Sequence, residues 1–158
     1  MLSIILQTER LLLRPPVAAD ISCFVPLLND FEISKNLSRA PHPYTEDDGC
    51  AWVVRTAGER VRGDSYPFVV MDKNEDKLLG MCAVHPHLDF MLGYWIGKPH
   101  WGQGYATEAV RRVAEFAFDE LGCNELTANW MHDNPASGRV LEKIGCRPNG
   151  TEERDCLS

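Results

Sequence analysis

Two glycines separated by one residue stand just before a strongly periodic helical segment, in the run Trp101-Gly102-Gln103-Gly104-Tyr105-Ala106-Thr107. Small residues leave backbone N–H groups uncovered, and the start of a helix carries a partial positive charge. Together these properties predict a loop that binds an anion such as phosphate. The run matches neither the dinucleotide-binding G-x-G-x-x-G pattern nor a P-loop. A tight turn without a ligand uses the same residue types, so the glycines alone leave both interpretations open.

The charge pattern favours the phosphate interpretation. Residues 90–107 contain no Asp or Glu in a chain with 23 acidic residues, and Lys98, Arg111 and Arg112 are close in sequence. The chain of 158 residues has a net charge of −7. Nucleic acid and anionic membranes select basic surfaces, so we expect neither as a partner. A cationic partner is easier to accommodate.

A second pair of polar residues accompanies the last predicted helix. Asn134-Pro135 predicts its start, because Asn is a favoured N-cap and Pro is favoured at the first helical position. Ser137 then shares a helical face with Leu141 and Ile144. A hydroxyl on an apolar face indicates a polar neighbour. A serine that bonds its own helix backbone is the alternative.

The six cysteines form no C-x-x-C pair, so the sequence predicts no zinc knuckle and no redox motif. We expect reduced thiols, a cytoplasmic location and no metal. Residues 1–6 lack the basic leader and the long apolar run of a signal peptide.

Hydrophobic periodicity predicts the elements that position these residues. We expect strands at 11–13, 66–71, 78–84, 90–96 and 126–130, and helices at 18–29, 45–60, 107–121 and 134–145, with an irregular segment at 30–44. Short turns between the three middle strands predict an antiparallel meander. On the helix at 107–121, Val110, Val113 and Ala117 should face the core and Glu108 should face outward. The expected fold is a mixed α/β (α+β) sheet with the order β-α-α-β-β-β-α-β-α, in one domain of residues 1–158.

At this point the sequence resembles the GNAT N-acetyltransferases. The resemblance is carried by Gly93–Ile96, by Trp101–Ala109, and by Asn134–Ser137 with Leu141–Gly145. The opening Thr8–Arg14 is similar to the RimJ/RimL-type branch, whose members acetylate protein N-terminal amines. The resemblance extends from residue 8 to about residue 148 in the family's order, and it implies the GNAT acyl-CoA N-acyltransferase fold.

The resemblance implies that acetyl-CoA is the cofactor, that CoA is the product and that no metal takes part. The diphosphate would lie on main-chain N–H groups of Gly102, Gln103, Gly104, Tyr105, Ala106 and Thr107. The main chain of Trp95 and Ile96 would face the pantetheine arm, and the Ile96 N–H would stabilise the developing oxyanion. Trp101 stands where the family usually has Gln or Arg, so we expect one side-chain phosphate contact to be missing.

The same resemblance assigns roles to the last helix. It implies that the Asn134 side chain bonds the pantetheine, that Arg139 reaches the CoA phosphates and that the Ser137 hydroxyl protonates the leaving thiolate. Many relatives use a tyrosine as this acid, at the position of Leu141, so Ser137 is the substitute. A simple capping role for Asn134 and a solvated surface position for Arg139 remain alternatives.

The general base is not fixed by the sequence. Relatives often carry Glu where Met91 stands, and the nearby candidates are His85, His87, Asp89 and Glu108. An α-amine has a pKa of about 7.7–8.0, against about 10.4 for lysine, and therefore depends less on a base.

The resemblance thus implies acetyl transfer from acetyl-CoA to the N-terminal α-amine of a protein or peptide. A small-molecule amine acceptor (amino acid, polyamine or drug) and a non-catalytic acyl-CoA-binding domain are the alternatives, and a homodimer is open. Family members continue with two more strands, whereas residues 147–158 supply at most one short strand. We therefore expect either a truncated chain or a partner that covers the sheet edge.

Overall fold

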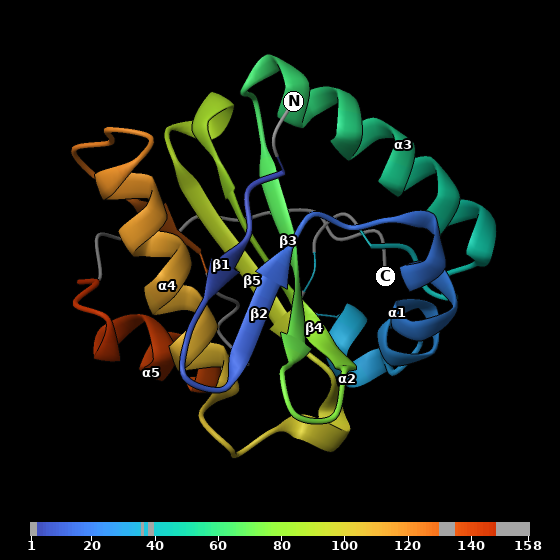
Figure 1. The fold of residues 1–158 in the computed structure, drawn as a ribbon. Coiled ribbons are helices and arrows are strands. Elements are labelled where there is room, and N and C mark those ends of the chain that lie inside the picture. The colour runs from blue at the N-terminus through green and yellow to red at the C-terminus, as the bar shows by residue number, and fades with distance from the viewer. Residues whose placement is uncertain (1–2, 36, 38–39, 130–134, 148–158) are drawn as a thin grey trace.

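The computed structural model describes residues 3–35, 37, 40–129 and 135–147. Within these residues a six-stranded sheet lies between two layers of helices (Figure 1). The strands are β1 (Leu6–Gln7), β2 (Leu11–Arg14), β3 (Tyr66–Asp72), β4 (Lys77–His85), β5 (Met91–Ile96) and β6 (Thr127–Ala128). The helices are α1 (Ile21–Leu28), α2 (Phe31–Ser34), α3 (Glu46–Arg62), α4 (Tyr105–Asp119) and α5 (Pro135–Lys143), with short 3-10 turns η1 (Ala18–Asp20), η2 (Pro86–Leu88) and η3 (Lys98–His100).

The strands lie in the sheet in the same order as in the chain. Neighbours from β1 to β5 pair antiparallel, which confirms the predicted meander, and β5 pairs with β6 in parallel. The parallel pairing is short: Met91 lies opposite Thr127 and Leu92 opposite Ala128. The second half of β5, Gly93–Ile96, has β4 on one side and no described strand on the other. Among the described residues, the sheet is therefore open along this half of β5, which is called the open edge below.

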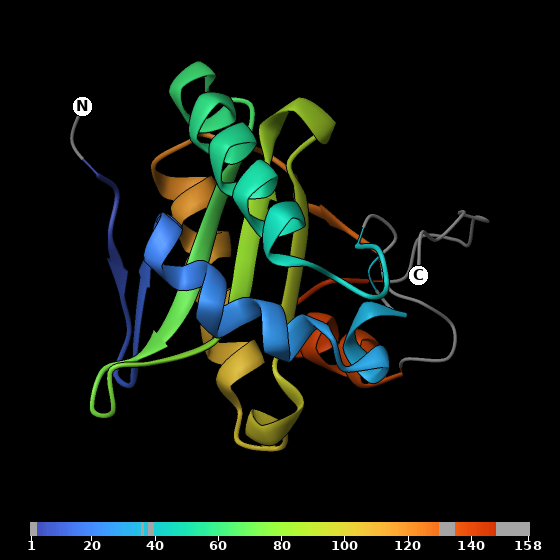
Figure 2. The ribbon, with the colours of Figure 1, turned by 90° about the vertical axis from the view of Figure 1, so that its right-hand side faces the viewer.

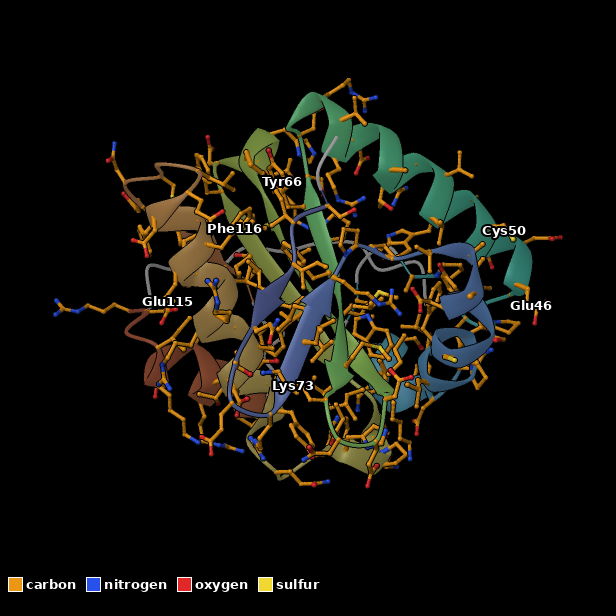
Figure 3. The ribbon with its side chains drawn as sticks, in the orientation of Figure 1. Glu46, Cys50, Tyr66, Lys73, Glu115 and Phe116 are labelled. Atoms are coloured by element: carbon orange, nitrogen blue, oxygen red, sulfur yellow. The ribbon has the colours of Figure 1, made fainter. Side chains whose placement is uncertain are left out.

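Each face of the sheet is covered by its own helices (Figure 2). On one face the buried stripe of α4, which includes Val110, Val113 and Phe116, packs on the sheet, as its periodicity predicts. Tyr66 of β3 and Phe116 point toward each other there, with ring centroids 5.6 Å apart (Figure 3). On the other face α1 and α3 bury a second cluster around Phe24. Buried side chains thus cover both faces of the sheet, and a ligand can reach it only at its edge or at the loops that join its strands to the helices.

The structure adds two elements that the sequence prediction lacks and shifts the bounds of others. The two-residue strand β1 was not predicted; it forms a hairpin with β2 and buries Leu6. The segment expected to be irregular at 30–44 contains helix α2, which Asp30 caps by accepting a hydrogen bond from the Glu32 N–H at 2.9 Å. Helix α4 begins at Tyr105 instead of residue 107 and ends at Asp119 instead of residue 121. The sequence predicts at most one short strand in residues 147–158, and all of these but residue 147 lie outside the described residues.

Candidate cofactor site and acyl-transfer site

The glycine loop joins β5 to α4 through two left-handed residues. Gly102 has φ 76° and Gly104 has φ 80°, conformations that other residues adopt only with strain. Gly104 is the N-cap of α4 and offers no side chain to cap the helix, and the first intrahelical bond runs from the Glu108 N–H to the Gly104 carbonyl at 3.1 Å. The N–H groups of the first helical residues therefore have no acceptor within the helix. The six loop residues predicted to hold the diphosphate are contiguous, and Tyr105, Ala106 and Thr107 form the first turn.

Trp101 fixes the start of this loop to the end of β5. Its indole N–H donates to the main-chain carbonyl of Ile96 at 2.7 Å, while the side chain is 47% exposed. The sequence predicts only a missing phosphate contact at this position. The indole instead closes the loop on the strand, a contact that the sequence did not indicate.

The register of β5 decides which of its main-chain groups reach the open edge. The Gly97 N–H donates to the Leu79 carbonyl at 2.8 Å, so alternate residues of β5 direct their main-chain groups to β4. Trp95, opposite Met81, is one of them. Ile96 and Tyr94 direct theirs to the open edge. The expectation for Trp95 is therefore corrected: the β-ladder takes up its N–H and carbonyl, and the open-edge position belongs to Ile96 and Tyr94.

Helix α5 approaches the open edge at its first turn. The Tyr94 hydroxyl donates to the Ser137 carbonyl at 3.1 Å. Burial raises the pKa of Tyr94, so the hydroxyl keeps its proton and remains a donor. Ser137 is half-buried, and Leu141 one turn later is only 4% exposed within the core. The structure thus brings Ser137 to the same strand half as Ile96.

The other predicted residues of this helix are less informative. Arg139 is exposed on α5. Asn134 lies outside the described residues, so its predicted contact with the pantetheine has no structural counterpart here.

Glu108 does not face outward as predicted. Its side chain is 22% exposed, and its carboxylate forms an ion pair with Arg10 at 2.8 Å. The Thr8 hydroxyl and the Arg10 N–H also donate to it. Burial opposes ionisation, but the hydrogen bonds from Thr8 and Arg10 outweigh it and hold the pKa of Glu108 below its usual value. The carboxylate is occupied, which removes it from the base candidates.

The remaining base candidates lie at the other end of β5. His85 ends β4, His87 is in η2, and Asp89 precedes β5, whereas the glycine loop follows it. The His85 Nδ1 lies 2.7 Å from the Oγ of Ser65, which is fully buried, and the His87 Nδ1 lies against the main-chain oxygen of Asp64. A strand of six residues spans roughly 17 Å, so these side chains are not assembled with the glycine loop.

Within the part of the chain that the structure describes, no three His, Cys, Asp or Glu side chains are grouped so that they could hold a metal ion. The helices found there are also too short or too polar to cross a membrane.

Comparison with known proteins identifies the class of protein to which this fold and site belong. Residues 10–147 match the family model described as an acetyltransferase (GNAT) domain. The uncharacterized N-acetyltransferase p20 of Bacillus licheniformis is 25% identical over 150 residues, 92% of this chain and 83% of the relative.

Solved structures share the fold. The GNAT-family acetyltransferase of Bacillus anthracis has a TM-score of 0.82 at 25% identity, over 93% of this chain and 86% of its own. RimL, a ribosomal L7/L12 α-N-protein acetyltransferase in complex with coenzyme A, has a TM-score of 0.77 at 16% identity, over 90% and 83% of the two chains. The chain belongs to the GNAT family of acetyltransferases, and it is an acyltransferase.

Proposed function

We propose that this protein transfers the acetyl group of acetyl-CoA to the N-terminal α-amine of a protein or peptide. The observation that carries the proposal is the open half of β5 beside the uncapped start of α4. Acetyl-CoA, the cofactor of the family, supplies the activated thioester when bound. The chain offers N–H groups for a diphosphate at residues 102–107, and next to them a strand edge that suits the amide groups of a pantetheine arm.

Two groups of the chain fit the chemistry of acyl transfer. The N–H of Ile96 is directed to the open edge and can donate to the thioester oxygen as negative charge develops on it. The Ser137 hydroxyl, carried by the first turn of α5, can give its proton to the leaving sulfur. Asn134 and Arg139 keep their proposed roles toward the pantetheine and the phosphates.

The groups around the open edge support an α-amine as the acceptor. The residues described there, 93–96, 101–107 and 135–138, include no Asp, Glu or His, and Glu108 is engaged by Arg10. About a quarter of an α-amine is unprotonated at pH 7.4, against about 0.1% of a lysine side chain. A site with this composition therefore suits an α-amine that loses its proton to water. RimL, a structural relative, is itself named as an α-N-protein acetyltransferase.

The test is release of CoA thiol from acetyl-CoA with three sets of acceptors. The first is a panel of peptides with a free α-amine, the second the same peptides with the α-amine blocked and one internal lysine, and the third small amines that include amino acids and polyamines. We expect turnover with the first set, and mass spectrometry should locate the acetyl group on the first residue. Turnover confined to the small amines would replace the acceptor, and turnover with the blocked peptides would reject the α-amine.

A further inference from the structure

The turn that joins β1 to β2 is held on two sides. On one side the Lys73 N–H donates to the Arg10 carbonyl at 3.0 Å, and the Lys73 ammonium donates to the Thr8 carbonyl. Figure 3 labels Lys73 where this turn meets the turn between β3 and β4. On the other side Glu108, in the first turns of α4, accepts from the Thr8 hydroxyl and from the Arg10 N–H at 3.0 Å. Residues 8–10 are thus fixed against the start of α4.

The side chain of Arg10 extends from this turn onto the glycine loop. Its Nε donates to Glu108 at 2.8 Å, and its Nη1 donates to the main-chain carbonyl of Gln103 at 2.9 Å. The guanidinium carbon lies 4.4 Å from the centre of the Tyr105 ring. A Cβ placed on Gly104 would lie 3.4 Å from Nη2. One side chain therefore contacts Gln103 and Tyr105 of the loop as well as the carboxylate of Glu108.

These contacts have two physical consequences. In a trans peptide the C=O and the next N–H point in opposite directions, so a Gln103 carbonyl held by Arg10 turns the Gly104 N–H to the other side of the loop. The carboxylate of Glu108 stands close to the helix start, where it would repel a phosphate, and the guanidinium neutralises it.

The geometry points to Arg10 as a positioning residue for the cofactor loop: it orients the Gln103–Gly104 peptide and cancels the charge of Glu108, so that the start of α4 accepts a diphosphate. The inference rests on the use of acetyl-CoA in the proposed function and does not depend on the acceptor. Arg10 acts through the loop and through Glu108. The phosphates of the cofactor would bind to the main-chain N–H groups of the loop and not to Arg10.

The test measures the binding of CoA by calorimetry in the absence of any acceptor. We expect Arg10→Gln to weaken CoA binding about tenfold, because it leaves Glu108 uncompensated at the helix start. Binding of pantetheine, which lacks the diphosphate, should not change. Arg55→Gln is the matched control, since Arg55 forms an ion pair with Glu59 on α3, away from the loop. In turnover assays the KM for acetyl-CoA should rise while kcat stays within twofold.

The double variant Arg10→Gln with Glu108→Gln separates positioning from direct contact. If Arg10 acts by neutralising Glu108, removal of both charges restores CoA affinity to within about threefold of the wild type. A loss that persists in full in the double variant, or CoA affinity unchanged in Arg10→Gln, overturns the inference. If Arg10→Gln alone does not fold, the double variant can still be used to measure CoA binding, because it leaves no unpaired charge.

Failure of the two proposals would look different. Wild-type protein that binds CoA but acetylates no α-amine overturns the acceptor and leaves Arg10 testable by binding. Wild-type protein that does not bind CoA at millimolar concentration overturns both.

Discussion

The indole of Trp101 and the main-chain carbonyl of Ile96 are joined by a hydrogen bond of 2.7 Å that closes the glycine loop on the last residue of β5. The same residue, Ile96, directs its N–H to the open edge where we place acyl transfer. The contact therefore couples the two halves of the proposed site: the loop that we propose for the phosphates and the strand end that we propose for the thioester. Because Trp101 remains half-exposed, its ring buries little apolar surface, and its main role is to orient the loop through the hydrogen bond.

Substitution of Trp101 by Phe should keep the ring and remove the N–H. The Ile96 carbonyl then loses its donor, at a cost of about 1 kcal/mol, and the loop is held less firmly. We expect the KM for acetyl-CoA to rise roughly fivefold in steady-state assays. An unchanged KM would show that the loop keeps its shape without this bond.

Substitution of Tyr94 by Phe should lower the free energy of unfolding by about 1 kcal/mol, because the Ser137 carbonyl loses its donor. Urea denaturation provides the measurement. Tyr66→Phe is the control: Tyr66 packs on Phe116 in the same core, and its hydroxyl has no hydrogen-bond partner among the residues that the structure describes. Equal effects of the two substitutions would mean that the Tyr94 bond does not anchor α5.

Substitution of Ser137 by Ala tests the proposed acid. Removal of a proton donor to the leaving group should lower kcat by about 10²–10⁴-fold and leave the KM for acetyl-CoA nearly unchanged. Ser137→Thr retains a hydroxyl and should recover most of the rate. A wild-type kcat in the alanine variant would remove Ser137 from the mechanism.

The stability of the fold should depend on the ionisation of Glu108. The pKa of this carboxyl is lower in the folded protein than its ordinary value of 4.5, because the hydrogen bonds from Thr8 and Arg10 outweigh the effect of burial. The stabilisation is therefore fully present above pH 4.5 and is lost as the pH falls through the lower folded value. We expect urea midpoints to fall less between pH 6 and pH 3 in Glu108→Gln than in the wild type. Parallel curves for the two proteins would contradict the prediction.

Two glycines on facing strands should respond differently to alanine. A Cβ on Gly80 would lie 2.1 Å from the Trp95 carbonyl oxygen and 2.8 Å from the Ile96 Cα, so Gly80→Ala must push β4 from β5 beside the site. We expect a loss of about 3 kcal/mol in the free energy of unfolding. A Cβ on Gly93 meets no atom within 4 Å, so Gly93→Ala should remain within about 1 kcal/mol of the wild type. Chemical denaturation of both variants makes the comparison, and similar losses would contradict it.

Most of the fold could be predicted because the long elements carry their own signals. The stripe of Val110 and Val113 defines α4, and Thr45 and Asp48 cap the start of α3 reciprocally. Strand β1 and helix α2 escaped prediction for the opposite reason. Two or four residues are too few to show a period, and Leu6 is buried only because β2 and α4 lie against it.

The candidate site was predictable where residue types are decisive and unpredictable where register or distant contacts decide. Gly102 and Gly104 mark the loop because left-handed conformations favour glycine. Whether Trp95 or Ile96 faces the open edge depends on which of the two pairs with β4, and a shift of one residue reverses the answer. The partner of Glu108 lies 98 residues earlier in the chain, and local sequence contains no trace of such a contact.

This separation also sets an order of events during synthesis. Arg10 leaves the ribosome long before Glu108, Gln103 and Tyr105 exist, and contacts between segments so far apart form late in folding. The β1–β2 turn must wait for the helix that completes it. The contacts of Arg10 with the glycine loop can therefore form only after most of the protein has been translated.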